Sequence, residues 1–331
     1  MDAWTNPPQA RARWSRRALL AAAMAACALP ARAAGHASPR ALKPGMGSDA
    51  ADGVFPRRVQ HHLGATTVLR APRRVVVLST GQIDAALALG VVPAGAARND
   101  VGNLFAPYLA RAHAPLQAQM ARTLDLGGRA APDLEAIAAL QPDLILVNRA
   151  ILRPEIHRLY MRIAPTVVTQ GNGLNWKVDF LLLADALGRR QQAQAWLDGF
   201  HAEAAAHAAR LRVRAAPTVS FLQSNGARIR VMGTGSFAGG IAEDMGLARP
   251  ASQRFPRNSQ DLSAEMLDLA DADWLFHASR GKGLERSPLW PRLGAVRAHR
   301  AVEVDLDAFY LNAGPTAART VLATLQRAVS S

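Results

Sequence analysis

The stretch from Trp176 to Val213 is the longest helical signal in this sequence, and it constrains the fold more than any other feature. Between Ala193 and Ala204, apolar residues recur at three- and four-residue steps, which places them on one face of an α-helix. Gly188 interrupts the stretch and predicts a kink or a brief break, because glycine inside a helix costs about 1 kcal/mol relative to alanine. The part after Gly188 would still be roughly 35 Å long, at 1.5 Å per residue. Such a helix either packs within one domain or joins two lobes.

Short apolar segments alternate with helical ones on both sides of this stretch, which predicts βα units and mainly parallel sheets. A hairpin is predicted about Asn225 and Gly226. Ligands of such sheets bind beyond the carboxyl ends of the strands, so the loops to watch are 79–82, 97–105, 127–131 and 148–153. The predicted strands are 57–63, 65–69, 75–78, 91–94, 124–126, 144–147, 166–169, 218–222, 228–232, 274–276 and 301–304. The predicted helices are 83–89, 134–140, 154–163, 237–245, 262–269 and 315–328.

An internal repeat supports the interpretation as two lobes. Residues 134–146 align with 264–276, with Glu135 matching Glu265 and Asp143 matching Asp273 at one constant offset. We therefore predict an α/β fold of two βα lobes, joined by a long helix and separated by a cleft. The predicted boundaries are 55–174 for the N-terminal lobe, 175–214 for the linking helix and 215–331 for the C-terminal lobe.

The N-terminus has the pattern of an export signal over residues 1–33. Two adjacent arginines at 16–17 precede a short apolar run and the sequence Ala-Arg-Ala at 31–33. The arginine pair favours the twin-arginine route to the periplasm, with an ordinary Sec signal as the alternative. Lipid attachment at Cys27 stays open, although we prefer a soluble mature form. Residues 34–54 are small and polar, and predict a flexible lead-in.

Composition excludes several classes of function. The net charge of +14 could serve nucleic acid, an anionic membrane or an anionic ligand. Basic runs with interleaved aromatic residues are missing from the sequence, so we expect no nucleic-acid partner. The 9 histidines show no zinc-binding spacing, and nothing resembles a nucleophile–base pair. We therefore expect neither a metal site nor an enzyme.

Two long runs carry a family resemblance. The sequences RVVVLSTGQIDAALALGVVPAG at 74–95 and GRAAPDLEAIAALQPDLI at 128–145 resemble iron-siderophore periplasmic binding proteins of ABC importers. Shorter matches at 163–166, 184–188, 262–265 and 287–290 extend the resemblance over most of 70–330. The segments 125–129 and 308–310 resemble the ferric hydroxamate (ferrichrome-type) branch.

The resemblance implies a function, a ligand and a partner. A protein of this family captures a ferric siderophore in its cleft and delivers it to an ABC permease dimer in the inner membrane. The ligand carries the Fe³⁺, so no cofactor is implied, and we expect a monomer. Haem or cobalamin binding is the alternative within this class, and an exported α/β enzyme is the alternative outside it.

The branch also implies ligand-binding residues. Arg129 matches an arginine that contacts the iron-binding oxygens, a task that suits its permanent charge and forked donors. Phe105 matches a pocket tryptophan, and Phe309 and Tyr310 keep an aromatic pair. Each could instead be a solvated charge or a core residue.

This sequence departs from the branch at two arginines. Arg149 lies where a pocket tyrosine is missing, and Arg257 lies near a second missing tryptophan. Additional arginines favour a more anionic chelate, of the citrate or citrate-hydroxamate type, although both could be solvated surface charges.

Glu135 and Glu265 are the predicted docking residues for the permease. Each begins an equivalent helix, one in each lobe, and a carboxylate there is also favoured locally by the helix dipole. In similar family members such a pair is thought to meet basic residues on the two membrane subunits.

Overall fold

The structure is a computed structural model that describes residues 39–98, 102–211, 216–226, 228–281 and 283–330. The predicted export signal at 1–33, with Cys27, lies outside the described residues. Within the described part of the chain, none of the helices is long and apolar enough to cross a membrane.

The N-terminal lobe is built on a five-stranded parallel sheet with the strand order β5-β4-β3-β6-β7. Its central strands β3 and β6 are apolar and buried up to the polar Asn148 at the end of β6, as expected where helices cover both faces of a parallel sheet. The strands are β3 (Val75–Val77), β4 (Gly95–Arg98), β5 (Leu124–Gly128), β6 (Leu144–Asn148) and β7 (Thr166–Thr169). A separate antiparallel hairpin of β1 (Arg57–His61) and β2 (Gly64–Val68) precedes them.

Helices connect the strands of this lobe, and α6 has the bounds that the sequence predicts. The α-helices are α2 (Thr80–Ala88), α3 (Pro107–Ala112), α4 (Gln117–Met120), α5 (Leu134–Ala139) and α6 (Pro154–Ile163). The short 3₁₀ helices are η1 (Ala114–Leu116), η2 (Arg149–Ile151) and η3 (Gly173–Asn175).

The C-terminal lobe has a mixed sheet with the order β10-β9-β8-β11-β12. Strands β8, β11 and β12 are parallel, whereas β9 runs antiparallel to both β8 and β10. The strands are β8 (Val219–Ser224), β9 (Ile229–Met232), β10 (Ser259–Leu262), β11 (Trp274–Ser279) and β12 (Ala301–Glu303). The predicted hairpin about Asn225 and Gly226 is therefore confirmed as β8–β9.

The connections of this lobe include one correction to the sequence analysis. The helix predicted at 262–269 is instead the end of β10 followed by a 3₁₀ helix, with Met266 at non-helical angles. The α-helices are α9 (Phe237–Asp244), α10 (Gly294–Arg297) and α11 (Pro315–Ser330). The 3₁₀ helices are η4 (Ala251–Gln253), η5 (Ala264–Ala270), η6 (Leu284–Arg286) and η7 (Trp290–Arg292). A π-helical turn, η8 (Asp307–Leu311), precedes α11.

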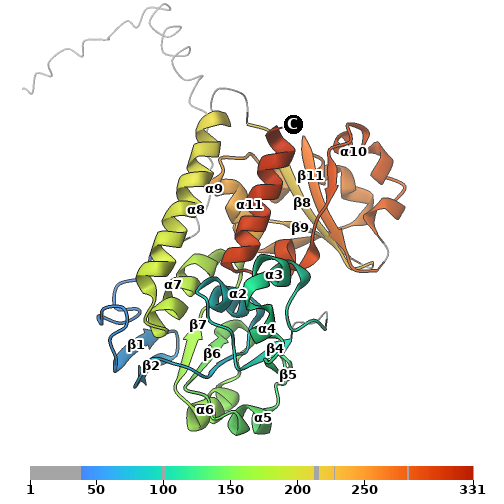
Figure 1. The fold of residues 1–331 in the computed structure, drawn as a ribbon. Helices are drawn as coiled ribbons and strands as arrows, with labels where there is room; N and C mark the ends of the chain where they lie inside the picture. Colours follow the sequence, from blue (N-terminus) through green and yellow to red (C-terminus); the bar gives the residue numbers. More distant parts are fainter. Residues whose placement is uncertain (1–38, 99–101, 212–215, 227, 282, 331) are drawn as a thin grey trace, which may run out of the picture. The chain divides into compact units, whose positions relative to one another are not determined.

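The linking helix is two helices, α7 (Trp176–Ala186) and α8 (Arg190–Leu211). The break falls at Gly188, whose φ of 69° lies in the left-handed region that glycine adopts without strain. The predicted interruption is therefore confirmed. Figure 1 shows α8 running beside α11, the closing helix of the chain. Because α11 packs on α2 and α3 as well as on α9, it is a second element shared by the two lobes.

A buried carboxylate fixes α11 to the N-terminal lobe. Asp84 of α2 is fully buried and accepts hydrogen bonds from the backbone N–H groups of Thr316 (2.8 Å) and Ala317 (2.9 Å). Tyr108 donates its hydroxyl to the same carboxylate at 3.1 Å. Burial raises the pKa of Asp84 despite these donors. Asp84 of the N-terminal lobe thus caps the N-terminus of α11 in the C-terminal lobe.

The internal repeat is also present in the hydrogen bonding. Asp143, just before β6, accepts from the backbone N–H groups of Arg73 and Arg74, both at 2.9 Å. Asp273, just before β11, accepts from the backbone N–H (2.7 Å) and the hydroxyl (2.8 Å) of Thr218. In each lobe, therefore, the matching aspartate ties together the starts of two neighbouring parallel strands.

Residues 39–54 are attached to the fold, in contrast to the flexible lead-in that their composition predicts. Gly47 and Gln60 exchange two backbone hydrogen bonds of 2.8 Å. The carboxylate of Asp52 accepts from the backbone N–H groups of Arg190 (2.9 Å) and Gln191 (2.8 Å), so it caps the start of α8. Because small polar residues show no apolar periodicity, these hydrogen bonds could not be predicted from the sequence pattern.

Candidate functional site

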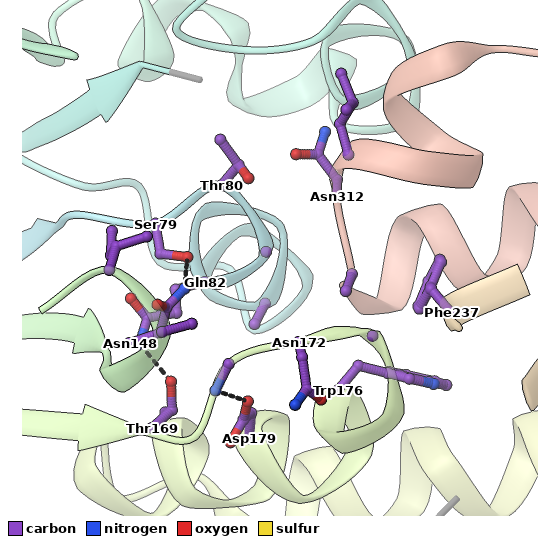
Figure 2. Close-up of a pocket in the computed structure, with 18 of the residues that line it drawn as sticks. Ser79, Thr80, Gln82, Asn148, Thr169, Asn172, Trp176, Asp179, Phe237 and Asn312 are labelled. Atoms are coloured by element: carbon purple, nitrogen blue, oxygen red, sulfur yellow. Dashed lines mark hydrogen bonds between the residues drawn. The ribbon is translucent and has the colours of Figure 1, made fainter. Parts of the chain in front are cut away.

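A cavity of about 300 Å³ lies where the two lobes meet. One wall comes from the loops that follow β3, β6 and β7, at the carboxyl ends of the parallel strands. The other wall comes from the end of β9, the start of α9 and the η8 turn. Figure 2 shows Asn312 and Phe237 on elements separate from those that carry Ser79, Asn148 and Thr169. The cavity occupies the position at which parallel α/β sheets bind ligands.

The wall from the N-terminal lobe is polar and internally ordered. Asn148 donates from its side-chain amide to the Ser79 hydroxyl at 2.6 Å, and Gln82 donates to the Thr169 hydroxyl at 2.9 Å (Figure 2). The amide oxygens of Gln82, Asn148 and Asn312 are buried without a hydrogen-bond partner among the described residues. Buried polar atoms normally have partners, so these three oxygens are exceptions within the polar wall.

A second polar group fixes the loop after β7. Asp179, in the first turn of α7, accepts from the backbone N–H groups of Gln170 (2.9 Å) and Gly171 (2.8 Å). Burial raises the pKa of Asp179 to about 7, although these two hydrogen bonds act in the opposite direction. The carboxyl group is therefore partly protonated near neutral pH, which reduces its repulsion of an anionic ligand.

A cluster of packed aromatic side chains lies behind the cavity wall at Trp176. Trp176 is buried, and its ring makes edge contacts with Trp196, Phe200 and Phe237 at centroid distances of 6.1, 5.4 and 5.7 Å. These residues come from α7, α8 and α9, so the linking helices and the C-terminal lobe share one aromatic cluster. The part of the cavity wall formed by Trp176 is therefore fixed in place by a packed aromatic core.

Three of the sequence-predicted site residues line this cavity: Arg129, Phe309 and Tyr310. Arg129 is half-exposed and follows β5, and its backbone N–H donates to the Arg98 carbonyl at 3.1 Å. Phe309 is 2% exposed and packs on Phe276, so it belongs both to the core and to the cavity wall. The Tyr310 hydroxyl donates to the Phe276 carbonyl at 2.9 Å, away from a ligand.

The other three predicted residues, Phe105, Arg149 and Arg257, are not among the described residues that line the cavity. Phe105 packs half-buried against the core. Arg149 is exposed and precedes the lining residue Ala150. Arg257 is also exposed and donates to the Gln260 side chain at 3.1 Å. Arg149 and Arg257 each adjoin a lining residue in sequence, but consecutive side chains point in different directions.

The sequence analysis missed most of the polar wall. The loops 79–82 and 148–153 are identified correctly as strand-end loops, but their hydroxyl and amide residues carry no spacing signature. The loop after β7, with Asn172 and Gly173 at the cavity, is absent from the predicted set although the same strand-end rule applies to it.

The two predicted docking glutamates are exposed, at equivalent positions. Glu135 is the second residue of α5, which Asp133 caps by accepting from the backbone N–H groups of Glu135 and Ala136, both at 3.0 Å. Glu265 is the second residue of η5, where hydrogen bonds from its own backbone N–H and from Ser263 lower its pKa.

The chain belongs to the family described as "Periplasmic binding protein", whose sequence pattern matches residues 75–308. It is 31% identical over 277 residues to the probable siderophore-binding lipoprotein YfiY of Bacillus subtilis, covering 78% of this chain and 82% of that protein. It is 27% identical over 279 residues to the Fe(3+) dicitrate-binding periplasmic protein FecB of Escherichia coli (82% and 89% covered). It is also 27% identical over 307 residues to the iron(3+)-hydroxamate-binding protein FhuD of Bacillus subtilis (88% and 89% covered).

A solved structure confirms the predicted fold class. Staphylococcus aureus SirA, complexed with staphyloferrin B, superposes with a TM-score of 0.71 at 24% identity, over 82% of this chain and 98% of that one. The two α/β lobes joined by long helices are thus the fold of this class, which is one of binding proteins and not of enzymes.

Proposed function

We propose that this protein binds a ferric siderophore in the cavity between its lobes and delivers it to an ABC importer in the inner membrane. The observation that carries the proposal is a polar cavity at the carboxyl ends of the strands, shared by two lobes, in a chain of this family. The names of its relatives support the ligand class, since they specify a siderophore, Fe(3+) dicitrate and an iron(3+) hydroxamate.

The lining of the cavity favours a ligand of the hydroxamate or citrate-hydroxamate type. Arg129 and Asp179 are the only charged side chains among the described residues of the wall, and the remaining polar groups are amides and hydroxyls. Neutral amide and hydroxyl groups suit a chelate of low net charge, such as a ferric hydroxamate. Arg149 and Arg257, which adjoin the wall, would attract carboxylate groups of a mixed chelate at the rim.

Haem is the weaker ligand within this class. A bound haem commonly takes an axial histidine, cysteine, methionine or tyrosine. The described lining residues include no histidine or cysteine, and the Tyr310 hydroxyl is used by the Phe276 carbonyl. Met232 lines the wall but is 4% exposed.

Fluorescence titration of the purified protein tests the proposal, because Trp176 lies in the cavity wall. The panel consists of ferric hydroxamate, citrate-hydroxamate and catecholate siderophores, haem and cobalamin, with each siderophore also tested free of iron. We expect saturable, tight quenching by a ferric hydroxamate or citrate-hydroxamate. Tight binding of haem or cobalamin alone would overturn the proposal.

We also propose that the protein reaches the periplasm by the twin-arginine route. The relatives are named as a periplasmic protein and as a lipoprotein, and both kinds lie outside the cytoplasm. The support for the route is the pair Arg16 and Arg17 before the apolar run. Replacing both arginines by lysine should retain the protein in the cytoplasm, as measured by cell fractionation, whereas a Sec signal would tolerate the change.

A further inference from the structure

A second cavity of about 280 Å³ lies in the N-terminal lobe beside the ligand cavity. It is the unfilled end of the small hydrophobic core between the sheet and helices α5 and α6. Its apolar walls are formed by Leu78, Pro132, Leu134, Val147, Ile151, Leu152, Ile156 and the ring of Tyr160.

The chemistry of this recess suits an aliphatic group. Leu78, Val147 and Tyr160 are almost fully buried, and Arg129 and Arg153 are the only charged side chains among its described lining residues. Burial raises the pKa of Tyr160 to about 12, so the phenol is neutral. An apolar protein cavity of about 150 Å³ binds benzene, so a recess of about 280 Å³ has room for a longer hydrocarbon group.

The recess adjoins the ligand cavity. Arg129 and Ile151 line both spaces. Ala130 and Ala131, which also line the recess, are exposed, so it opens to solvent and is not a sealed void. A group tethered to a chelate beside Arg129 therefore has a short path into apolar surroundings.

We propose that the siderophore of this protein carries an aliphatic arm, such as a medium-length acyl chain, and that the arm occupies this second cavity. The inference rests on the proposed function, since the chelate must lie in the first cavity. The arm would be released from water as the chelate binds, and each buried methylene tightens binding about fourfold. An arm that fills the recess thus contributes orders of magnitude in affinity.

Two ferric probes that differ only in their arm test this. Ferrioxamine B is acylated on its free amine with either an acetyl or an octanoyl chain, which leaves the iron-binding groups and the charge the same. We expect the octanoyl probe to bind the wild-type protein at least about tenfold more tightly. Equal affinity of the two probes would overturn the inference and leave the proposed function intact. Binding of neither probe, where another ferric siderophore binds, would also overturn the inference alone, whereas tight binding of only haem or cobalamin would overturn the proposed function with it.

Two matched substitutions assign the effect to the recess. Ala131→Trp fills the second cavity, and Ala150→Trp fills the first; both positions are exposed alanines. Ala131→Trp should abolish the octanoyl advantage and leave the affinity for the acetyl probe unchanged, whereas Ala150→Trp should weaken both probes. Ile156→Phe is a second filling variant should Ala131→Trp fold poorly by melting analysis. An octanoyl advantage that survives both filling variants would contradict the proposal.

Discussion

The two lobes share a repeated βα unit but contribute different chemistry to the cavity. In the N-terminal lobe all five strands are parallel, and the carboxyl ends of three of them, with the start of α2, bring Ser79, Gln82, Asn148 and Thr169 to one place. In the C-terminal lobe β9 and β10 run in alternate directions, and the wall is more apolar, with Phe237 among its residues. A fully parallel sheet concentrates polar strand-end loops at one edge. We infer that the first lobe orients the ligand and the second covers it.

The largest expected effect concerns the surface that the two lobes present together. We propose that Glu135 and Glu265 supply one carboxylate from each lobe to the importer, so replacing both by alanine should reduce siderophore uptake by cells about tenfold or more. Ligand affinity and melting temperature should stay near wild type, since both side chains are exposed. Glu155→Ala, which removes an exposed glutamate from the first turn of α6, is the matched control. Normal uptake at native expression would reject the docking role.

The second prediction compares one arginine from each lobe. Arg129→Ala should weaken binding of the ferric siderophore by about 1.5–3 kcal/mol, the scale of a hydrogen bond to a charged group. Arg257→Ala should cost less than about 1 kcal/mol, because Arg257 is exposed and does not line the cavity. Fluorescence titrations measure both. Equal losses would place the two arginines in equivalent roles, and an unaffected Arg129→Ala protein would assign Arg129 to the surface.

The third prediction concerns the repeated aspartates. Asp143→Ala and Asp273→Ala should each lower the free energy of unfolding by about 1–3 kcal/mol, because each leaves backbone donors without a partner. Burial opposes ionisation of Asp143, but hydrogen bonds from Arg70, Arg74 and Arg73 outweigh it and lower its pKa to about 2. Its contribution is therefore fully present above about pH 4 and is lost as the pH falls through 2.

Urea unfolding at neutral pH measures both changes, with Asp198→Ala on the exposed face of α8 as the control. If only one of the two substitutions lowers the free energy of unfolding, the two aspartates do not have equivalent structural roles.

The smallest effect is the pH dependence at Asp179. Because burial raises its pKa to about 7, the folded protein holds a proton that the unfolded chain has lost between about pH 4 and 7. Stability from this group therefore falls as the pH rises through that window. Asp179→Asn should reduce the change in melting temperature between pH 5 and pH 7.5 by about 4 °C.

Other groups titrate in the same window, so the comparison between wild type and variant is what isolates Asp179. The pKa of Asp185, raised to about 6 by burial, acts in the same direction, and those of His61 and His201, lowered to about 4 by burial, act in the opposite one. An unchanged pH profile in the variant would contradict the raised pKa.

Local signals in the sequence account for the parts of the fold that could be predicted. The break at Gly188, the Asn225–Gly226 hairpin and the bounds of α6 each depend on residues close in sequence. The strand β10 could not be found in this way. Its residues, Ser259–Leu262, are polar except for Leu262, show no alternation and form a strand only because β9 pairs with them.

The site, too, has residues that the sequence could place and residues that it could not. Arg129 could be placed by its resemblance to a known motif, and the structure puts it in the cavity wall. The amides of Gln82, Asn148 and Asn312 come from distant segments, and only the folded chain brings them together. Side-chain direction was also beyond the sequence, since Arg149 and Ala150 are neighbours but only Ala150 lines the cavity.

The position of iron in a crystal of the protein with a ferric siderophore tests the central claim most directly. Anomalous scattering at the iron edge locates the metal without assumptions about the ligand. We predict a single strong peak in the cavity between the lobes, with chelate oxygens within hydrogen-bond distance of Arg129 and no bond from iron to a protein side chain. A peak outside this cavity, or iron coordinated directly by protein groups, would contradict the account.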